Sequence, residues 1–212
     1  MVANHAGMIP YDGAMVRAAI MAEHPHPRHA RMLVVDWAFA LPFVSLFLTK
    51  TGNVLAHPDN AVTLLERDEL VGVFPEGVKG ASKLYRDRYQ VQRLGRGGFV
   101  QVALRTGAPI IPVAIVGSEE LHPVLADLRP LAKLLGLPVV PLTPTFPWLG
   151  LGGLVPLPSK WFISFGRPIA VAHHGPESAE DPRIVLDLTE QVREWIQARV
   201  HRLLGRRRTI FF

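Results

Sequence analysis

The chain has 212 residues, of which 49% are hydrophobic and 19% charged, a balance that forms a folded core and excludes general disorder. Its 23 Lys and Arg outnumber its 18 Asp and Glu, and most of these cations are arginines, which favours anionic partners held by planar guanidinium groups. The lack of cysteine excludes disulfides, thiolate metal sites and a cysteine nucleophile.

The predicted elements alternate between helices and strands along the chain. Pro10 and Asp12 predict a helix that opens near residue 10 and runs to about Glu23. Asp181 and Pro182 predict the start of a long terminal helix with one apolar stripe. Between these helices, apolar runs with Gly or Pro borders predict strands, and periodic runs predict helices; the strands are Gly52–His57, Leu70–Phe74, Pro109–Gly117 and Trp161–Phe165, and the helices are Asn60–Arg67 and Phe99–Thr106.

This alternation predicts an α/β fold with a mixed, mostly parallel sheet flanked by helices. The sequence has no internal repeat and no linker-like stretch, so we interpret residues 1–212 as a single domain.

Positive charge is concentrated in two segments. Residues 79–105 hold seven basic side chains against one acidic one, and residues 183–208 hold seven against three. The rest of the chain is net negative.

Two apolar stretches raise the question of membrane contact, and the mean hydropathy of +0.21 is high for a soluble protein. The uncharged run between Lys133 and Lys160 is broken by many prolines and glycines, so it cannot span a bilayer as a helix. We interpret it as a loop around Trp148 that either covers the core or lies at a membrane interface. Residues 37–49 are interrupted by Pro42 and are too short to span. The start of the chain has no signal-peptide pattern.

The first chemical motif is His5 followed by Asp12. Pro10 prevents one helix from containing both residues, so we place His5 on a turn and Asp12 in the first helical turn. Such a turn can fold the imidazole onto the carboxylate, which makes a general base with an orienting partner. The alternative is an ordinary pair of surface polar groups.

The second motif is Phe74-Pro75-Glu76-Gly77, directly after a predicted buried strand. Open α/β sheets bind ligands at the carboxyl ends of their strands, which places Glu76 where a ligand would contact it. The alternative is a tight turn with a solvated carboxylate.

The third motif is a basic strip that ends in glycines before the helix at Phe99. Arginines beside a helix start suit a phosphate group, and the alternative is a solvated face. The strip's candidate anion-binding residues are Lys79, Lys83, Arg93 and Arg96.

In this order the motifs resemble the glycerolipid acyltransferase family, the 1-acylglycerol-3-phosphate acyltransferase-like group. The resemblance is carried by Asn4-His5 with Asp12, by Phe74–Gly77 and by Pro109-Ile110-Ile111-Pro112-Val113, and it covers about half the chain. It implies that His5 is the catalytic base, that Asp12 orients it, and that Phe74, Pro75, Glu76 and Gly77 line the acceptor site.

The implied activity is O-acyl transfer from a thioester to a hydroxyl of a glycerolipid or lysophospholipid. The donor would be acyl-coenzyme A or an acyl-carrier protein, which is a co-substrate rather than a resident cofactor. The implied location is peripheral, on the cytoplasmic side of a membrane.

Three departures from the family pattern matter. Six residues separate His5 from Asp12 where four are commoner, and His57 stands where the second family block has an arginine, which puts a glycerol-phosphate acceptor in doubt. Because only three residues precede Asn4, we also expect the family's first strand and any membrane-docking helix to be missing.

The alternatives left open are a catalytically inactive lipid-binding relative and a transferase acting on another lipid alcohol. A lipase-like hydrolase is disfavoured because the sequence has no Gly-x-Ser-x-Gly elbow, with Gly117-Ser118-Glu119 the nearest approach. A nucleic-acid partner is disfavoured because no recognised module accompanies the charge. The nine histidines are not at ligand spacing, so we predict no metal site.

Overall fold

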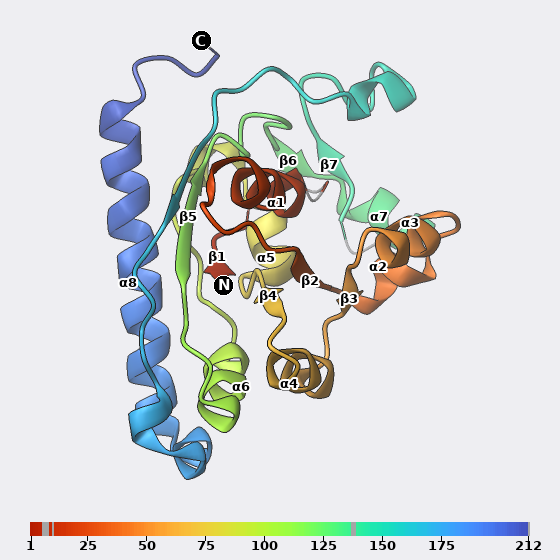
Figure 1. Ribbon diagram of the computed structural model, residues 1–212. Helices are drawn as coiled ribbons and strands as arrows, with labels where there is room; N and C mark the ends of the chain where they lie inside the picture. Colours follow the sequence, from red (N-terminus) through yellow and green to blue (C-terminus); the bar gives the residue numbers. More distant parts are fainter. Residues whose placement is uncertain (6–8, 10, 137–138, 212) are drawn as a thin grey trace.

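The computed structural model describes residues 1–5, 9, 11–136 and 139–211. Its centre is a mostly parallel sheet in the order β3-β2-β4-β1-β5-β8, in which only β8 is antiparallel to its neighbour (Figure 1). The two halves of the sheet meet where the Ala3 N–H donates to Val73 O over 3.1 Å and the Val73 N–H to Met1 O over 3.1 Å. The strands of this sheet are β1 Val2–Ala3, β2 Ala30–Val34, β3 Val54–Leu55, β4 Leu70–Gly72, β5 Pro112–Val116 and β8 Phe162–Phe165, and β6 Ala126–Asp127 and β7 Pro141–Leu142 pair separately.

Helices cover both faces of the sheet. Side chains of β1, β2 and β5 that alternate toward one face pack against α1, around Val16 and Ile20. The opposite face packs against α6 and α8, around Val100, Val192 and Ile196. The helices are α1 Tyr11–Glu23, α2 Asp36–Ala40, α3 Val44–Lys50, α4 Pro58–Glu66, α5 Gly77–Ala81, α6 Gly98–Thr106, α7 Arg129–Leu135 and α8 Pro182–Arg206, with short 3-10 turns at Tyr85–Asp87, Gly150–Leu154, Ala172–His174 and Pro176–Glu180.

Helix α8 runs the length of the sheet, as Figure 1 shows in blue. It begins as its sequence predicts, because the Asp181 carboxylate accepts a hydrogen bond from the Arg183 N–H over 2.8 Å and Pro182 stands at the first position. Beyond its end, Arg207 forms a buried ion pair with Glu120 and donates to Ser159 Oγ over 3.0 Å. The helix is thereby fastened to the loop after β5.

The predicted α/β class is confirmed, and the predicted helices and strands are present with shifted ends. Strand β2 was not predicted because Arg31 interrupts its apolar run, and the short elements α2, α3, α5, α7, β6 and β7 were not predicted either. The strand expected to be missing is present in short form, because Val2 and Ala3 fill its place between β4 and β5.

Between Lys133 and Lys160 the described residues are irregular as predicted, apart from the end of α7, strand β7 and one 3-10 turn. Trp148 and Leu149 are 73% and 64% exposed, so they do not cover the core. No helix within the described ranges is both long enough and apolar enough to cross a membrane.

Candidate active site

The carboxyl ends of β1, β4 and β5 converge at one edge of the sheet. His5 follows β1, the Phe74–Gly77 turn follows β4, and Ser118 follows β5, each about two residues beyond its strand. Because these strands are parallel neighbours, chain segments more than 100 residues apart meet at this edge.

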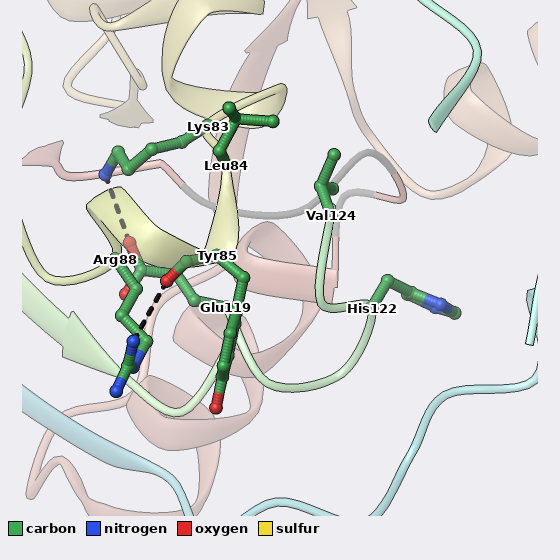
Figure 2. A pocket seen from close by; sticks show the side chains of 7 residues that line it. All are labelled: Lys83, Leu84, Tyr85, Arg88, Glu119, His122 and Val124. Atoms are coloured by element: carbon green, nitrogen blue, oxygen red, sulfur yellow. Dashed lines mark hydrogen bonds and ion pairs between the residues drawn. The ribbon is translucent and has the colours of Figure 1, made fainter. Parts of the chain in front are cut away.

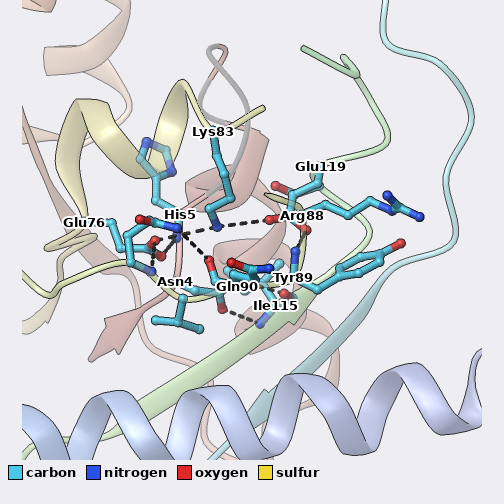
Figure 3. A network of polar contacts seen from close by, with 12 residues as sticks. Asn4, His5, Glu76, Lys83, Arg88, Tyr89, Gln90, Ile115 and Glu119 are labelled. Carbon is cyan, nitrogen blue, oxygen red and sulfur yellow. Dashed lines mark hydrogen bonds and ion pairs between the residues drawn. The ribbon is translucent and has the colours of Figure 1, made fainter. Parts of the chain in front are cut away.

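Asn4 fixes the point where the chain leaves the sheet. Its side-chain amide donates to Ile115 O over 2.9 Å and accepts from the Ile115 N–H over 2.8 Å. The buried side chain thus replaces a backbone partner of β5, as Figure 3 shows. Because the Asn4 side chain takes the place of a backbone partner, β1 ends here and His5 can turn out of the sheet.

His5 and Asp12 form the predicted dyad. His5 Nδ1 lies 2.7 Å from Asp12 Oδ2, and Asp12 is 1% exposed at the start of α1. An ionised carboxylate can only accept, so Nδ1 carries the proton in the neutral ring and Nε2 keeps its lone pair. Asp12 also accepts a hydrogen bond from the Ser118 hydroxyl, over 2.6 Å.

Glu76 holds the Phe74–Gly77 turn against the dyad. One carboxylate oxygen accepts from the His5 N–H over 2.8 Å, and the other accepts from the Gln92 N–H over 2.7 Å. The Phe74 ring packs on the imidazole, with the ring centroids 4.9 Å apart. Glu76 is therefore buried and bonded rather than solvated.

Lys83 lies inside this network, not on the surface. Its ammonium sits 3.1 Å from Glu119 Oε1 and 3.6 Å from Glu76 Oε2, and its side chain is 5% exposed (Figure 3). Glu119 also accepts from the Tyr89 N–H over 2.7 Å. Burial raises the pKa of both Glu76 and Glu119, although the Lys83 charge and the backbone donors oppose that rise.

A small pocket borders the network, as Figure 2 shows. Its volume is about 10 Å³, which is the room of about one water and excludes a substrate. The Arg88 guanidinium stacks on the Tyr85 ring here, 4.4 Å from the ring centroid. Burial lowers the pKa of His122 in the same wall.

A larger apolar cavity of about 260 Å³ lies between the sheet and the helices α4 and α6. Pro75 lines it, so it adjoins the Phe74–Gly77 turn. His57 and Arg96 are the ionisable side chains in its lining, and Ala61 and Val102 belong to its apolar wall.

The predicted site residues therefore fall into two groups. The structure brings together His5, Asp12, Phe74, Glu76 and Lys83, with Pro75 and Gly77 in the same turn. Lys79, Arg93 and Arg96 are exposed and outside the bonded network. Ser118 and Glu119 were missed as site residues, and their only sequence signal was their place after the apolar run that forms β5.

Among the described residues, no group of three or more His, Asp or Glu side chains is arranged to hold a metal ion. The chemistry visible at the site is that of an oriented imidazole beside bonded carboxylates.

Fold and site together define an α/β protein with a His–Asp dyad at the carboxyl edge of its sheet. The family model described as Acyltransferase matches residues 1–116, more than half of the chain. The chain therefore belongs to the acyltransferase family, which confirms the resemblance to glycerolipid acyltransferases drawn from its motifs.

Curated relatives match all or most of the chain. An uncharacterized protein of Mycobacterium tuberculosis is 52% identical over 212 residues, covering 100% of this chain and 59% of the relative. A second, from Mycobacterium leprae, is 51% identical over 212 residues, covering 100% of this chain and 58% of the relative. The Gallus gallus protein named "DGAT1/2-independent enzyme synthesizing storage lipids" is 24% identical over 200 residues, covering 93% of this chain and 54% of its own length. The chain thus spans under two thirds of the length of these relatives.

Among solved structures, the fold is similar to that of PlsC, the 1-acyl-sn-glycerophosphate acyltransferase of Thermotoga maritima. The TM-score is 0.56 with 19% identity, covering 95% of this chain and 64% of that chain. At this identity the likeness concerns the fold alone.

Proposed function

We propose that the protein transfers a fatty acyl group from a thioester, on coenzyme A or an acyl-carrier protein, to a hydroxyl of a glycerolipid or lysophospholipid. The single observation that carries the proposal is the 2.7 Å contact between His5 Nδ1 and the buried Asp12 carboxylate. In a member of the acyltransferase family, an imidazole held in this way is the group that can deprotonate an alcohol.

In the proposed reaction, His5 Nε2 takes the proton of the acceptor hydroxyl while its oxygen attacks the thioester carbonyl carbon. The tetrahedral intermediate collapses with cleavage of the C–S bond, and the imidazolium returns the proton to the leaving thiolate. Asp12 stabilises the imidazolium between these steps, as the carboxylate of a Ser-His-Asp triad does. No protein nucleophile is required, since the acceptor supplies the oxygen.

The remaining site residues have supporting roles in the proposal. Glu76 anchors the turn of Phe74, Pro75 and Gly77 beside the acceptor, and Lys83 balances its charge. The exposed cations Lys79, Arg93 and Arg96 would attract phosphates of coenzyme A, an acidic carrier protein or anionic lipid. The apolar cavity beside Pro75 is assigned to a hydrocarbon chain of donor or acceptor, because its wall is mostly apolar.

The proposal names a class of acceptor, a glycerolipid or lysophospholipid with a free hydroxyl, and not a single compound. PlsC is named for an acceptor with a phosphate group, whereas the Gallus gallus relative is named for storage lipids. His57 in place of the family's arginine favours an acceptor that needs no guanidinium at that position. Peripheral contact with a membrane on its cytoplasmic side belongs to the same proposal.

Release of free thiol from an acyl-coenzyme A, measured with and without a panel of lipid acceptors, tests the function. Transfer is supported if thiol release depends on the acceptor and an ester of that acceptor is formed. Release without an acceptor would indicate a hydrolase. Binding of the acyl donor with no release would indicate an inactive lipid-binding relative.

A further inference from the structure

The segment from Asp36 to Lys50 forms a helical hairpin, α2 followed by α3, whose apolar side chains are mostly left outside the core. The thirteen residues between these two charged ends include no ionisable side chain. Of all the residues in the two helices, Leu48 alone is buried. Phe43 is 89% exposed, Phe47 65% and Leu46 57%, so the hairpin presents a large apolar surface outward.

The tip of the hairpin is held in an unfavourable backbone conformation. Phe43 has φ 63°, in the left-handed region that bulky side chains rarely occupy, and it stands directly before α3. The Val44 N–H donates to Pro42 O over 2.7 Å across the same turn. Folding stability would favour glycine or asparagine at this position, so the exposed phenylalanine indicates a function for the tip.

The hairpin lies at the same edge of the sheet as the dyad. It begins two residues after β2 ends, and β2 is parallel to β4. Figure 1 shows α2 and α3 in orange on the side of the molecule away from α8. A surface that covered the hairpin would therefore approach the edge where His5 and Glu76 lie.

We infer that the α2–α3 hairpin docks on a phospholipid bilayer and inserts Phe43 and Phe47 between the head groups; the choice of a bilayer rests on the proposed function, whose acceptor is a lipid. The projecting tip offers only Ser45 and Thr49 as polar side chains, whereas protein interfaces combine apolar contacts with a polar rim. Lys50 is exposed at the end of the apolar segment and makes no ion pair in the part of the chain described, so its charge suits a lipid phosphate.

Co-sedimentation of the full chain with vesicles of phosphatidylcholine and a minority of phosphatidylglycerol tests this inference. The double variant Phe43→Asn with Phe47→Ser removes the aromatic rings, and asparagine tolerates the left-handed turn. We expect it to reduce vesicle binding at least about tenfold, because two rings are no longer buried in lipid. The control Leu186→Ser removes an exposed leucine from α8 and should bind as the parent chain does.

Three results would overturn the inference: no vesicle binding by the parent chain, equal binding by the double variant, or a parent dimer that the double variant splits. An unchanged far-ultraviolet circular dichroism spectrum and unfolding midpoint would establish that the variant is folded. A separate assay of acyl transfer, with a short-chain acyl-coenzyme A and a water-soluble acceptor, tests the proposed function without a membrane. Turnover there with no vesicle binding overturns the docking, and vesicle binding without turnover overturns the proposed chemistry.

Discussion

His5 is constrained from three directions at once. Its backbone N–H is held by Glu76, its Nδ1 by Asp12 and its ring face by Phe74. Two of these contacts come from the Phe74–Gly77 turn, and the third comes from the start of α1. A general base acts within hydrogen-bond reach of the proton that it removes, so fixing the imidazole before the substrate binds lowers the cost of reaching that geometry.

Ser118 is a positioning residue in this arrangement, since its hydroxyl bonds Asp12 rather than His5. We expect Ser118→Ala to lower kcat by about tenfold or somewhat more, because a hydrogen bond to a buried carboxylate is lost. KM should change little, and Ser118→Thr should restore much of the activity. Steady-state kinetics measure this, with Ser178→Ala on a distant 3-10 turn as the control. An unchanged kcat in Ser118→Ala would contradict the role.

Lys83 is predicted to act through stability rather than through contact with substrate. Lys83→Met leaves Glu76 and Glu119 buried without their shared cation, which should cost about 3–5 kcal/mol in the free energy of unfolding. The exposed Lys79→Met should change that free energy by less than about 0.5 kcal/mol. Urea unfolding of the two variants compares them directly, and equal midpoints would count against the proposed network.

The pH dependence of stability follows from the same pair of carboxyl groups. Burial raises the folded-state pKa of Glu119 above its ordinary value of 4.5, so between these two pKa values the folded state binds more protons than the unfolded state. The stability that Glu119 contributes is complete below pH 4.5 and is lost as the pH rises through the raised pKa.

Glu119→Gln removes this group, so its unfolding free energy should improve relative to the parent chain as the pH rises from 4.5. Chemical unfolding at a series of pH values measures the difference. The exposed Glu177→Gln serves as the control. A difference between Glu119→Gln and the parent that is flat across the series would show that the buried carboxyl group does not titrate as expected.

At the scale of elements, the sequence predicted those parts of the site that depend on local chemistry. The position of Pro10 predicted that His5 contacts Asp12 at the start of a helix, and Pro75 and Gly77 after an apolar run predicted the end of β4; the structure has both features. Ser118 and Glu119 could not be found in this way, because their roles depend on β5 lying beside β1. Lys83 was counted as a surface cation, since its burial depends on carboxylates from two other segments.

The elements that were not predicted have equally physical reasons. Strand β2 is centred on Met32 with Arg31 beside it, so it lacks the uninterrupted apolar run of the other strands. The α2–α3 hairpin is too short to show helical periodicity, and Pro42 divides it. Its exposure is a property of the folded molecule that apolar residues alone do not reveal.

The cavity between the sheet and helices α4 and α6 gives a prediction about the length of the acyl chain that the protein accepts. Ala61→Leu adds three carbon atoms to the cavity wall, so we expect kcat/KM for a long-chain acyl donor to fall by roughly tenfold relative to a short-chain donor. The exposed Ala198→Leu on α8 is the matched control. Identical chain-length profiles for the parent chain and both variants would mean that the acyl chain lies elsewhere.

At the scale of the whole molecule, one edge of the sheet carries the candidate active site, and α8 packs on a face of the sheet away from it. The carboxyl edge of the sheet carries the dyad, the Phe74–Gly77 turn and the exposed hairpin. Helix α8 supports the far side, and the buried pair of Arg207 with Glu120 fastens its end. Glu119 and Glu120 are adjacent in sequence, so the loop after β5 bonds to the Lys83 network on one side and to the terminal helix on the other.

The structure shows which of the basic side chains are buried and which are exposed. Part of the basic strip is internal, since Lys83 is buried between carboxylates and Arg88 stacks on Tyr85. The strip's cations Lys79, Arg86, Arg93 and Arg96 remain exposed, and Arg86 lies beside Asp87. In the proposed function, attraction of an anionic donor therefore depends on fewer charges than the sequence total indicates.

The measurement that tests the central claim most directly is ester formation from an acyl-coenzyme A and a lipid acceptor by His5→Gln. Loss of the general base predicts a fall in kcat of about 10²–10⁴-fold with the unfolding midpoint retained. His24→Gln, which changes an exposed histidine near the end of α1, should leave the rate unchanged. Ester formation by His5→Gln at the parent rate would contradict the assignment of His5 as the base.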